Sequence, residues 1–306
     1  MGIQLWRAAL AGLLGVISAT APAAPVERHI HYRDCGGLIC LEVPIGGQRE
    51  LFTLDTGNPS STIDLDLAKR LGLELTPAIR RNHPEETLQG IFKTGLPDTV
   101  VSDLDLVAPR IIAMNLGDFR KALGTPIAGT LAYASFKDRK LLLDPKHHVM
   151  TVTDAADTPA GPAPAGAQRY TLRLVTFGSD GPPVLTAESV TLNGHAFLAQ
   201  LDTEFPEAAL LFPPARDALG LQQAKPVGRR VLGYYDDNAE LLRLPAGAVG
   251  FGDPLFAGAG RHVFLPGKGV HFPDNEIALV VGTGWFRGHP VTLDLHDMTL
   301  TVAPIG

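Results

Sequence analysis

Two Asp-Thr pairs are the residues of this chain best suited to acid–base chemistry. They begin at Asp55 and Asp202, and each follows an apolar segment that predicts a strand. Two carboxylates held about 3 Å apart would repel by roughly 5 kcal/mol at an effective dielectric constant near 20, which corresponds to about four pKa units. Such a pair would hold one proton between its members. One carboxylate could then take a proton from water while the other donates a proton to a carbonyl oxygen.

The two pairs lie at matching positions of an internal repeat. The first half reads ELFTLDTGNPSSTIDLDLAKRLGL from Glu50 and the second reads HAFLAQLDTEFPEAALLFPPARDALGL from His195, so each half predicts a strand, a turn and a short helix that ends at Leu-Gly-Leu. Further on, FKDRKLLLDPKHHVMTV from Phe136 aligns without a gap with FRGHPVTLDLHDMTLTV from Phe286, and each segment predicts a β-hairpin. Shared parts in the same order indicate a duplicated chain.

An apolar strand that meets a glycine precedes each predicted hairpin, with Gly129 in the first half and Gly282 in the second. We expect these two glycines to be counterparts in the repeat. The run from Gly282 to Gly284 also resembles the start of a dinucleotide-binding loop, but Arg287 holds the third position of that fingerprint and a hairpin follows instead of a helix. We therefore interpret this run as a turn of a β-barrel.

Composition divides the chain into a leader, two lobes and a linker. Residues 154–168 read DAADTPAGPAPAGAQ, which predicts a Pro/Ala/Gly linker. It separates an N-terminal lobe at 24–153 from a C-terminal lobe at 169–306. The 33 glycines and 25 prolines, scattered among short apolar segments, indicate many turns and short strands.

Residues 1–23 have the pattern of a secretory signal peptide. Arg7 supplies a positive charge, an apolar run follows, and Ala21-Pro22-Ala23 has cleavage-site spacing. We expect an exported protein, periplasmic or extracellular, with no stable membrane anchor after cleavage. A membrane-spanning helix would need about 20 apolar residues, and no later segment approaches that length.

Cys35 and Cys40 are the two cysteines of the chain. In an oxidising compartment they can form a disulfide, which would contribute about 2 kcal/mol for so short a loop. Two free thiols remain an alternative. A metal site is less favoured because two thiolates need further ligands.

Several other classes of function are disfavoured. The formal net charge of -6 and the lack of a basic stripe argue against binding to a phosphate backbone. Neither a Gly-x-Ser-x-Gly nor a His-Glu-x-x-His motif occurs, so a serine nucleophile elbow and that type of zinc site have no candidate. We expect no cofactor and no metal.

The Asp-Thr-Gly at Asp55, the predicted helix at 68–73, the run Ala128-Gly129-Thr130-Leu131 and the closing hairpin resemble the bacterial retropepsin-like aspartyl proteases. With both lobes on one chain, the arrangement is similar to that of pepsin. The resemblance implies a mainly β fold: two pseudo-symmetric acid-protease-type β-barrel lobes with short helices and an active-site cleft between them. It further implies an aspartic-type endopeptidase, a monomer in which Asp55 and Asp202 form one catalytic dyad that hydrolyses a peptide or protein substrate.

The same resemblance assigns supporting roles around the dyad. The hydroxyls of Thr56 and Thr203 would hold the two turns together, and Gly57 would allow a tight bend beneath the carboxylate. The second lobe departs from the motif because Glu204 replaces that glycine. Each lobe also has a candidate substrate flap, the run 90–95 with Phe92 and the run 233–238 with Tyr235.

Two alternatives remain open. The chain could be a catalytically inactive binding or scaffold protein of the cell envelope, which Glu204 and Asn58-Pro59 favour and the retained Asp-Thr pairs oppose. The first lobe, whose motif is intact, could instead form a homodimeric site. If Glu204 turns toward the dyad, its charge would extend activity toward neutral pH. If it points away to an arginine or to solvent, it would not affect the pH profile.

Overall fold

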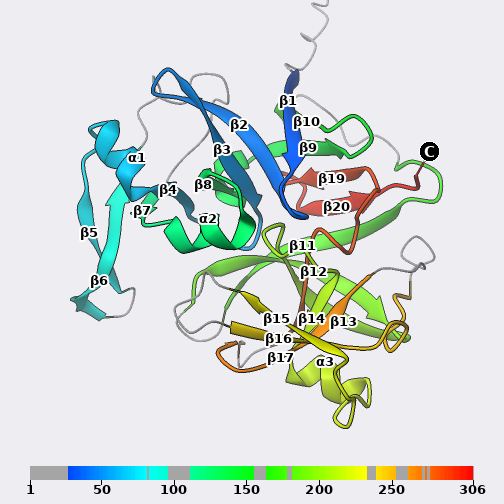
Figure 1. The fold of residues 1–306 in the computed structure, drawn as a ribbon. Coiled ribbons are helices and arrows are strands. Elements are labelled where there is room, and N and C mark those ends of the chain that lie inside the picture. The colour runs from blue at the N-terminus through cyan, green and yellow to red at the C-terminus, as the bar shows by residue number, and fades with distance from the viewer. Residues whose placement is uncertain are drawn as a thin grey trace, which may run out of the picture.

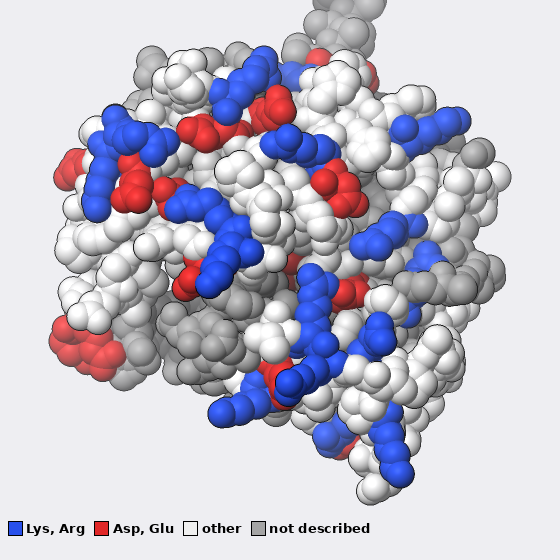
Figure 2. Space-filling view, viewed as in Figure 1, with Lys and Arg blue, Asp and Glu red and all other residues white. Residues whose placement is uncertain are grey.

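The computed structural model describes residues 27–80, 83–95, 111–154, 163–177, 181–232, 239–252, 261–270, 273 and 276–305. The predicted leader at 1–23 and most of the predicted linker lie outside these residues. No helix among those that the structure describes is long and apolar enough to cross a membrane. Charged side chains of both signs are interspersed over the face shown in Figure 2.

In the N-terminal lobe, Asp55 is the last residue of a buried strand. β2 (Ile39–Ile45) and β3 (Gln48–Asp55) form an antiparallel hairpin. β3 also pairs in parallel with β8 (Ile127–Ala132), which places Asp55 opposite Ala132. β4 (Ser61–Asp64) then pairs antiparallel with β8 and in parallel with β7 (Ile111–Met114). Asp55 therefore lies where a strand paired on both sides gives way to a turn.

The C-terminal lobe repeats this arrangement. β12 (Pro183–Leu192) and β13 (His195–Leu201) form the hairpin, and β13 pairs in parallel with β18 (Ile277–Val281). β14 (Ala209–Leu211) pairs antiparallel with β18 and in parallel with β17 (Val263–Pro266). Asp202 follows directly after β13, as Asp55 ends β3.

An antiparallel sheet joins the two lobes and lies at the upper right of Figure 1. Within it Leu142 of β9 is the partner of Thr292 of β19, and these two residues are counterparts 150 residues apart in the repeat. A residue that faces its own counterpart lies on the pseudo-twofold axis of the duplication. The strands in spatial order are β1 (Glu27–Asp34), β10 (Val149–Asp154), β9 (Arg139–Asp144), β19 (Val291–Asp294), β20 (Thr299–Val302) and β11 (Gln168–Thr176).

The two closing hairpins match in their backbone as well as their sequence. The carboxylate of Asp144 accepts the backbone N–H groups of the two residues at 146 and 147, and that of Asp294 accepts those at 296 and 297. His148 and Met298 then both adopt a left-handed conformation, with φ of 53° and 49°. The fold is thus mainly β and two-lobed, as the sequence predicted.

The short helices end as the repeat predicted. After α1 (Leu65–Arg70), Gly72 has φ of +68° and its N–H donates to the Lys69 carbonyl; after α3 (Pro213–Ala218), Gly220 has φ of +66° and donates to the Asp217 carbonyl. Glycine adopts this conformation without the steric cost of a Cβ, so it favours the helix stop. The other elements are β5 (Thr76–Arg80), β6 (His83–Thr94), α2 (Gly117–Leu123), η2 (Tyr133–Phe136), β15 (Gly228–Leu232) and β16 (Ala239–Arg243).

The expected equivalence of Gly129 and Gly282 is wrong by three residues. Gly129 pairs with Phe52 within β8, whereas Gly282 directly follows β18 and is the counterpart of Ala132, the last residue of β8. Each of the two glycines allows a close contact with a different group. A Cβ on Gly129 would lie 2.2 Å from the Phe52 ring, and one on Gly282 would lie 1.9 Å from the Phe205 carbonyl oxygen.

Candidate active site

The two Asp-Thr turns meet at the interface between the lobes. The Thr56 hydroxyl donates to the Leu201 carbonyl at 2.9 Å and accepts the Thr203 backbone N–H at 3.0 Å. Reciprocally, the Thr203 hydroxyl donates to the Leu54 carbonyl and accepts the Thr56 N–H at 3.0 Å. Both threonines are buried, so these bonds are shielded from water. The four bonds fix the two aspartate turns relative to each other.

The two aspartates have the same local geometry. Oδ1 of Asp55 accepts the N–H of Gly57 at 2.8 Å, and Oδ1 of Asp202 accepts the N–H of Glu204 at 2.8 Å. Asp55 is 5% exposed, and Asp202 is half-buried. The Asp202 carboxylate packs against the Gly57 backbone, because a Cβ built on Gly57 would lie only 2.6 Å from Asp202 Cγ. Glycine is thus needed at this position for the contact between the lobes.

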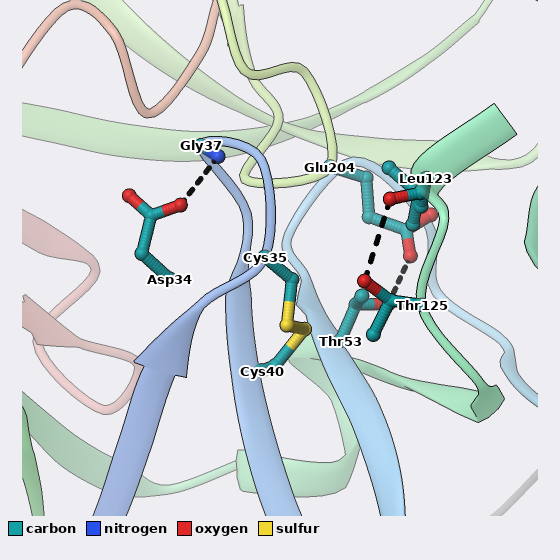
Figure 3. The surroundings of a disulfide bond; sticks show 8 residues. All are labelled: Asp34, Cys35, Gly37, Cys40, Thr53, Leu123, Thr125 and Glu204. Atoms are coloured by element: carbon teal, nitrogen blue, oxygen red, sulfur yellow. Dashed lines mark hydrogen bonds between the residues drawn. A yellow bond between two sulfur atoms is a disulfide. The ribbon is translucent and has the colours of Figure 1, made fainter.

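A second pair of hydrogen bonds crosses the interface from the residues two positions before each aspartate. Gln200 donates from Nε2 to the Gly57 carbonyl at 3.2 Å. Its counterpart Thr53 donates from its hydroxyl to the carboxylate of Glu204 (Figure 3). Glu204 therefore turns toward the opposite lobe, where its partner is the Thr53 hydroxyl. Neither Thr53 nor Gln200 was predicted from the sequence, although alternation along a strand places each of them on the same face as the aspartate.

The electrostatics of the site follow from three carboxyl groups in one buried region. The pKa of Asp55 is raised well above its usual value, first by burial, then by the charge of Glu204 and then by that of Asp202. Burial raises the pKa of Asp202 to about 6, opposed by the N–H groups of Glu204 and Phe205. Burial also raises the pKa of Glu204 to about 8, with a further contribution from Asp202, while the Thr53 hydrogen bond opposes the shift. Asp202 therefore ionises at a lower pH than Glu204.

Two further hydroxyls join the lobes beside the dyad. The phenol of Tyr133 donates to the Pro183 carbonyl at 3.1 Å, and the hydroxyl of Thr283 donates to the Gly37 carbonyl. Tyr133 and Thr283 are counterparts 150 residues apart, so these contacts are related by the pseudo-twofold axis. Burial, followed by the charge of Asp55, raises the pKa of Tyr133 to about 12, which keeps the phenol a donor. Neither Tyr133 nor Thr283 was predicted from the sequence as a residue of the site.

The predicted flap at 90–95 is wrong as a hairpin turn. Phe92 lies within β6, paired with Pro77 of β5 on one side and Ala113 of β7 on the other, and it packs against the core. In the register of the β5–β6 hairpin the last pair is Arg80 with His83, so this hairpin does not turn at 90–95. Tyr235 lies outside the described residues, between β15 and β16.

Cys35 and Cys40 form a disulfide next to this site. Cys40 is the strand partner of Thr53, the residue that binds Glu204. Figure 3 shows the disulfide beside the strand that carries Thr53. Among the residues that the structure describes, no group of three or more His, Cys, Asp or Glu side chains is arranged to hold a metal ion.

Comparisons with known proteins give likenesses among solved structures only. No family model and no curated protein matches the chain. Among solved structures, the chain is similar to basic 7S globulin from soybean, with a TM-score of 0.44 and 11% sequence identity over 92% of this chain and 95% of the globulin. The two-lobed fold and the site described above stand on the strand pairing and the hydrogen bonds of the chain itself.

Proposed function

We propose that the chain is an exported, retropepsin-like and pepsin-like aspartic endopeptidase that hydrolyses peptide bonds in a peptide or protein substrate. The observation that carries the proposal is the reciprocal exchange of hydrogen bonds between Thr56 and Thr203, which joins the turns that begin at Asp55 and Asp202. Two carboxylates can act as a unit only if the turns that carry them are held together in this way. Both lobes lie on one chain, so a monomer has a complete site.

The unequal surroundings of the two aspartates support distinct roles. Asp202, with the lower pKa, is the carboxylate that takes a proton from water. Asp55, whose pKa is raised well above its usual value, is the acid that donates a proton to the scissile carbonyl oxygen. Water oxygen bonds to the carbonyl carbon and gives a tetrahedral diol. Its collapse breaks the C–N bond, the amine leaves with a proton from Asp202, and Asp55 regains its proton from the diol hydroxyl.

Cleavage of a peptide library by the purified mature protein between pH 3 and 9 tests this proposal. Asp55→Asn and Asp202→Asn should each abolish cleavage while circular dichroism reports an intact fold. The double variant should lose no more than either single variant, because the two carboxylates act as a unit. Full activity in either single variant would exclude a dyad mechanism.

A catalytically inactive binding protein is the second candidate. The observation that favours it is the Glu204 side chain. Glu204 is the counterpart of Gly57 in the repeat, and it adds a third carboxyl group beside the two aspartates. In that case the wild type would bind peptides without cleaving them. If Glu204→Gly then created hydrolysis, the missing glycine would account for the inactivity.

Export is supported by the leader-like residues 1–23 and by the disulfide, since disulfides persist in oxidising compartments. Cell fractionation with an antibody to the mature chain tests it. A protein that retains residues 1–23 in the cytoplasm would contradict it.

A further inference from the structure

We propose that the disulfide-closed turn at 34–40 positions the Asp202 turn of the opposite lobe. The inference concerns the residues 204–206 that follow Asp202: Pro206 packs against this turn, Glu204 is bound from the strand beside it, and Phe205 is linked to the turn through Thr283. It rests on the proposed function only for its activity readout. Its structural readout does not require a working dyad.

Thr283 provides the first link. Its hydroxyl donates to the carbonyl of Gly37 within the turn, and its backbone N–H donates to the carbonyl of Phe205 at 2.9 Å. One residue thus connects the turn of the N-terminal lobe with the chain three positions after Asp202. Because Thr283 is buried, loss of its hydroxyl would leave the Gly37 carbonyl without this donor in a shielded place.

Direct packing of Gly37 provides the second link. A Cβ built on Gly37 would lie 2.8 Å from Pro206 Cβ and 2.9 Å from Arg287 Nη2. The Arg287 guanidinium in turn donates to the Pro206 carbonyl at 3.2 Å. The Gly37 backbone therefore rests on Pro206, and any added side chain must displace one of the two.

The disulfide provides the third link, through strand β3. It joins Cys35, whose N–H donates to the Leu38 carbonyl at 2.9 Å, to Cys40, the strand partner of Thr53. Thr53 holds Glu204. The Asp34 carboxylate completes the turn by accepting the Gly37 N–H at 2.7 Å. The same covalent loop therefore fixes the Gly37 carbonyl and the strand that binds Glu204 (Figure 3).

The pseudo-twofold counterpart of this contact has no disulfide. Tyr133 donates to the Pro183 carbonyl beside Asp55, and the chain has two cysteines, both in the 34–40 turn. Bracing by a covalent loop is therefore specific to the Asp202 side. Tyr133→Phe offers a control that removes the equivalent hydroxyl at the other aspartate.

Amide hydrogen exchange of residues 202–206, with steady-state kinetics beside it, tests the proposal. Gly37→Ala should speed exchange there and lower kcat roughly 10- to 100-fold, because small misplacement of a catalytic group has effects of this size. Gly36→Ala is the matched control, since Gly36 also has a positive φ of +72° in the same turn but a Cβ there meets nothing within 4 Å. Thr283→Val should act like Gly37→Ala, and Thr283→Ser should restore wild-type behaviour.

The Cys35→Ser/Cys40→Ser variant should speed the same exchange, and adding Thr283→Val to it should change exchange less than Thr283→Val does in the wild type, because the disulfide-closed turn holds the Gly37 carbonyl that Thr283 contacts. Equal exchange at 202–206 in wild type, Gly37→Ala and Thr283→Val would overturn the positioning role, whether or not the protein cleaves peptides. Equal effects of Gly36→Ala and Gly37→Ala would also overturn it. Faster exchange in a protein without peptidase activity would support the positioning role and count against the proposed function alone.

Discussion

The hydroxyl of Thr53 donates to the carboxylate of Glu204 across the lobe interface. At the related position of the other lobe, Gln200 donates to the backbone carbonyl of Gly57. The hydrogen-bond framework is therefore close to twofold symmetric, whereas the charge is not. A third carboxyl group lies beside Asp55, and its effects can be separated by measurement.

Glu204 should set the pH range of any peptidase activity. In the active form Asp202 is ionised and Asp55 is protonated. Asp202 ionises as the pH passes its pKa of about 6, and Asp55 keeps its proton until the pH reaches its own raised pKa. We expect kcat/KM to rise through about pH 6 as Asp202 ionises and to fall where Asp55 loses its proton, at a pH above the usual range of an aspartate. Removing the carboxylate in Glu204→Gln lowers the pKa of Asp55, so the upper limb of the profile should move to lower pH. The control is Glu42→Gln, which removes an exposed charge on β2; an unchanged upper limb in Glu204→Gln would contradict the role of this charge.

Stability should fall as the pH rises through the range in which these groups ionise. A raised carboxyl pKa means that the folded state binds protons more tightly than the unfolded state, whose Asp and Glu pKa values are about 4. The resulting stabilisation is fully present below about pH 4 and is lost as the pH passes the folded pKa values of about 6 for Asp202 and about 8 for Glu204. Denaturant titrations should show a lower free energy of unfolding at about pH 8.5 than at about pH 5, because these two pH values lie on either side of the folded-state pKa values of Asp202 and Glu204. Glu204→Gln should show a smaller decline; a wild-type curve that rises over this interval would contradict the assignment.

The Thr56 hydroxyl should contribute more to stability than its size implies. Thr56→Val keeps the shape of the side chain but leaves the Leu201 carbonyl and the Thr203 N–H without this partner. Each unsatisfied buried group costs about 1 to 3 kcal/mol, so we expect the two together to lower the free energy of unfolding by about 2 to 6 kcal/mol. Thr56→Ser retains the hydroxyl and should lose about 1 kcal/mol, the value of one methyl group. Equal losses in the two variants would show that packing, and not the hydrogen bonds, holds the turns.

Sequence alone predicted the parts of the site that belong to local motifs. Asp55, Asp202 and the two threonines follow from a repeat in which the same strand and turn occur twice, and a turn's residues are specified by their immediate neighbours. The helix-ending Gly72 and Gly220 follow for the same reason, because a left-handed stop depends on one residue.

The remaining features depend on contacts between distant segments. Nothing near Glu204 in sequence shows that Thr53 will face it from the other lobe. The mistaken match of Gly129 with Gly282 has a similar origin, because one glycine admits the Phe52 ring and the other admits the Phe205 carbonyl. The position of Phe92 was missed because the turn of a hairpin depends on strand register, which a glycine-flanked aromatic does not specify.

Gly57→Ala should disable the dyad from the side of Asp202. The new Cβ would lie 2.6 Å from Asp202 Cγ, well inside van der Waals contact, so either the Asp202 carboxylate or the Gly57 backbone must move. Both are tied into the interface, the first by the Glu204 N–H and the second by the Gln200 amide. We expect a fall in kcat of roughly 100-fold, as for other displacements of about 1 Å, together with a lower Tm. Gly95→Ala is the control, because a Cβ there meets nothing within 4 Å. If Gly57→Ala kept both wild-type kcat and wild-type Tm, the close packing of Asp202 on Gly57 could not be a working feature of the site.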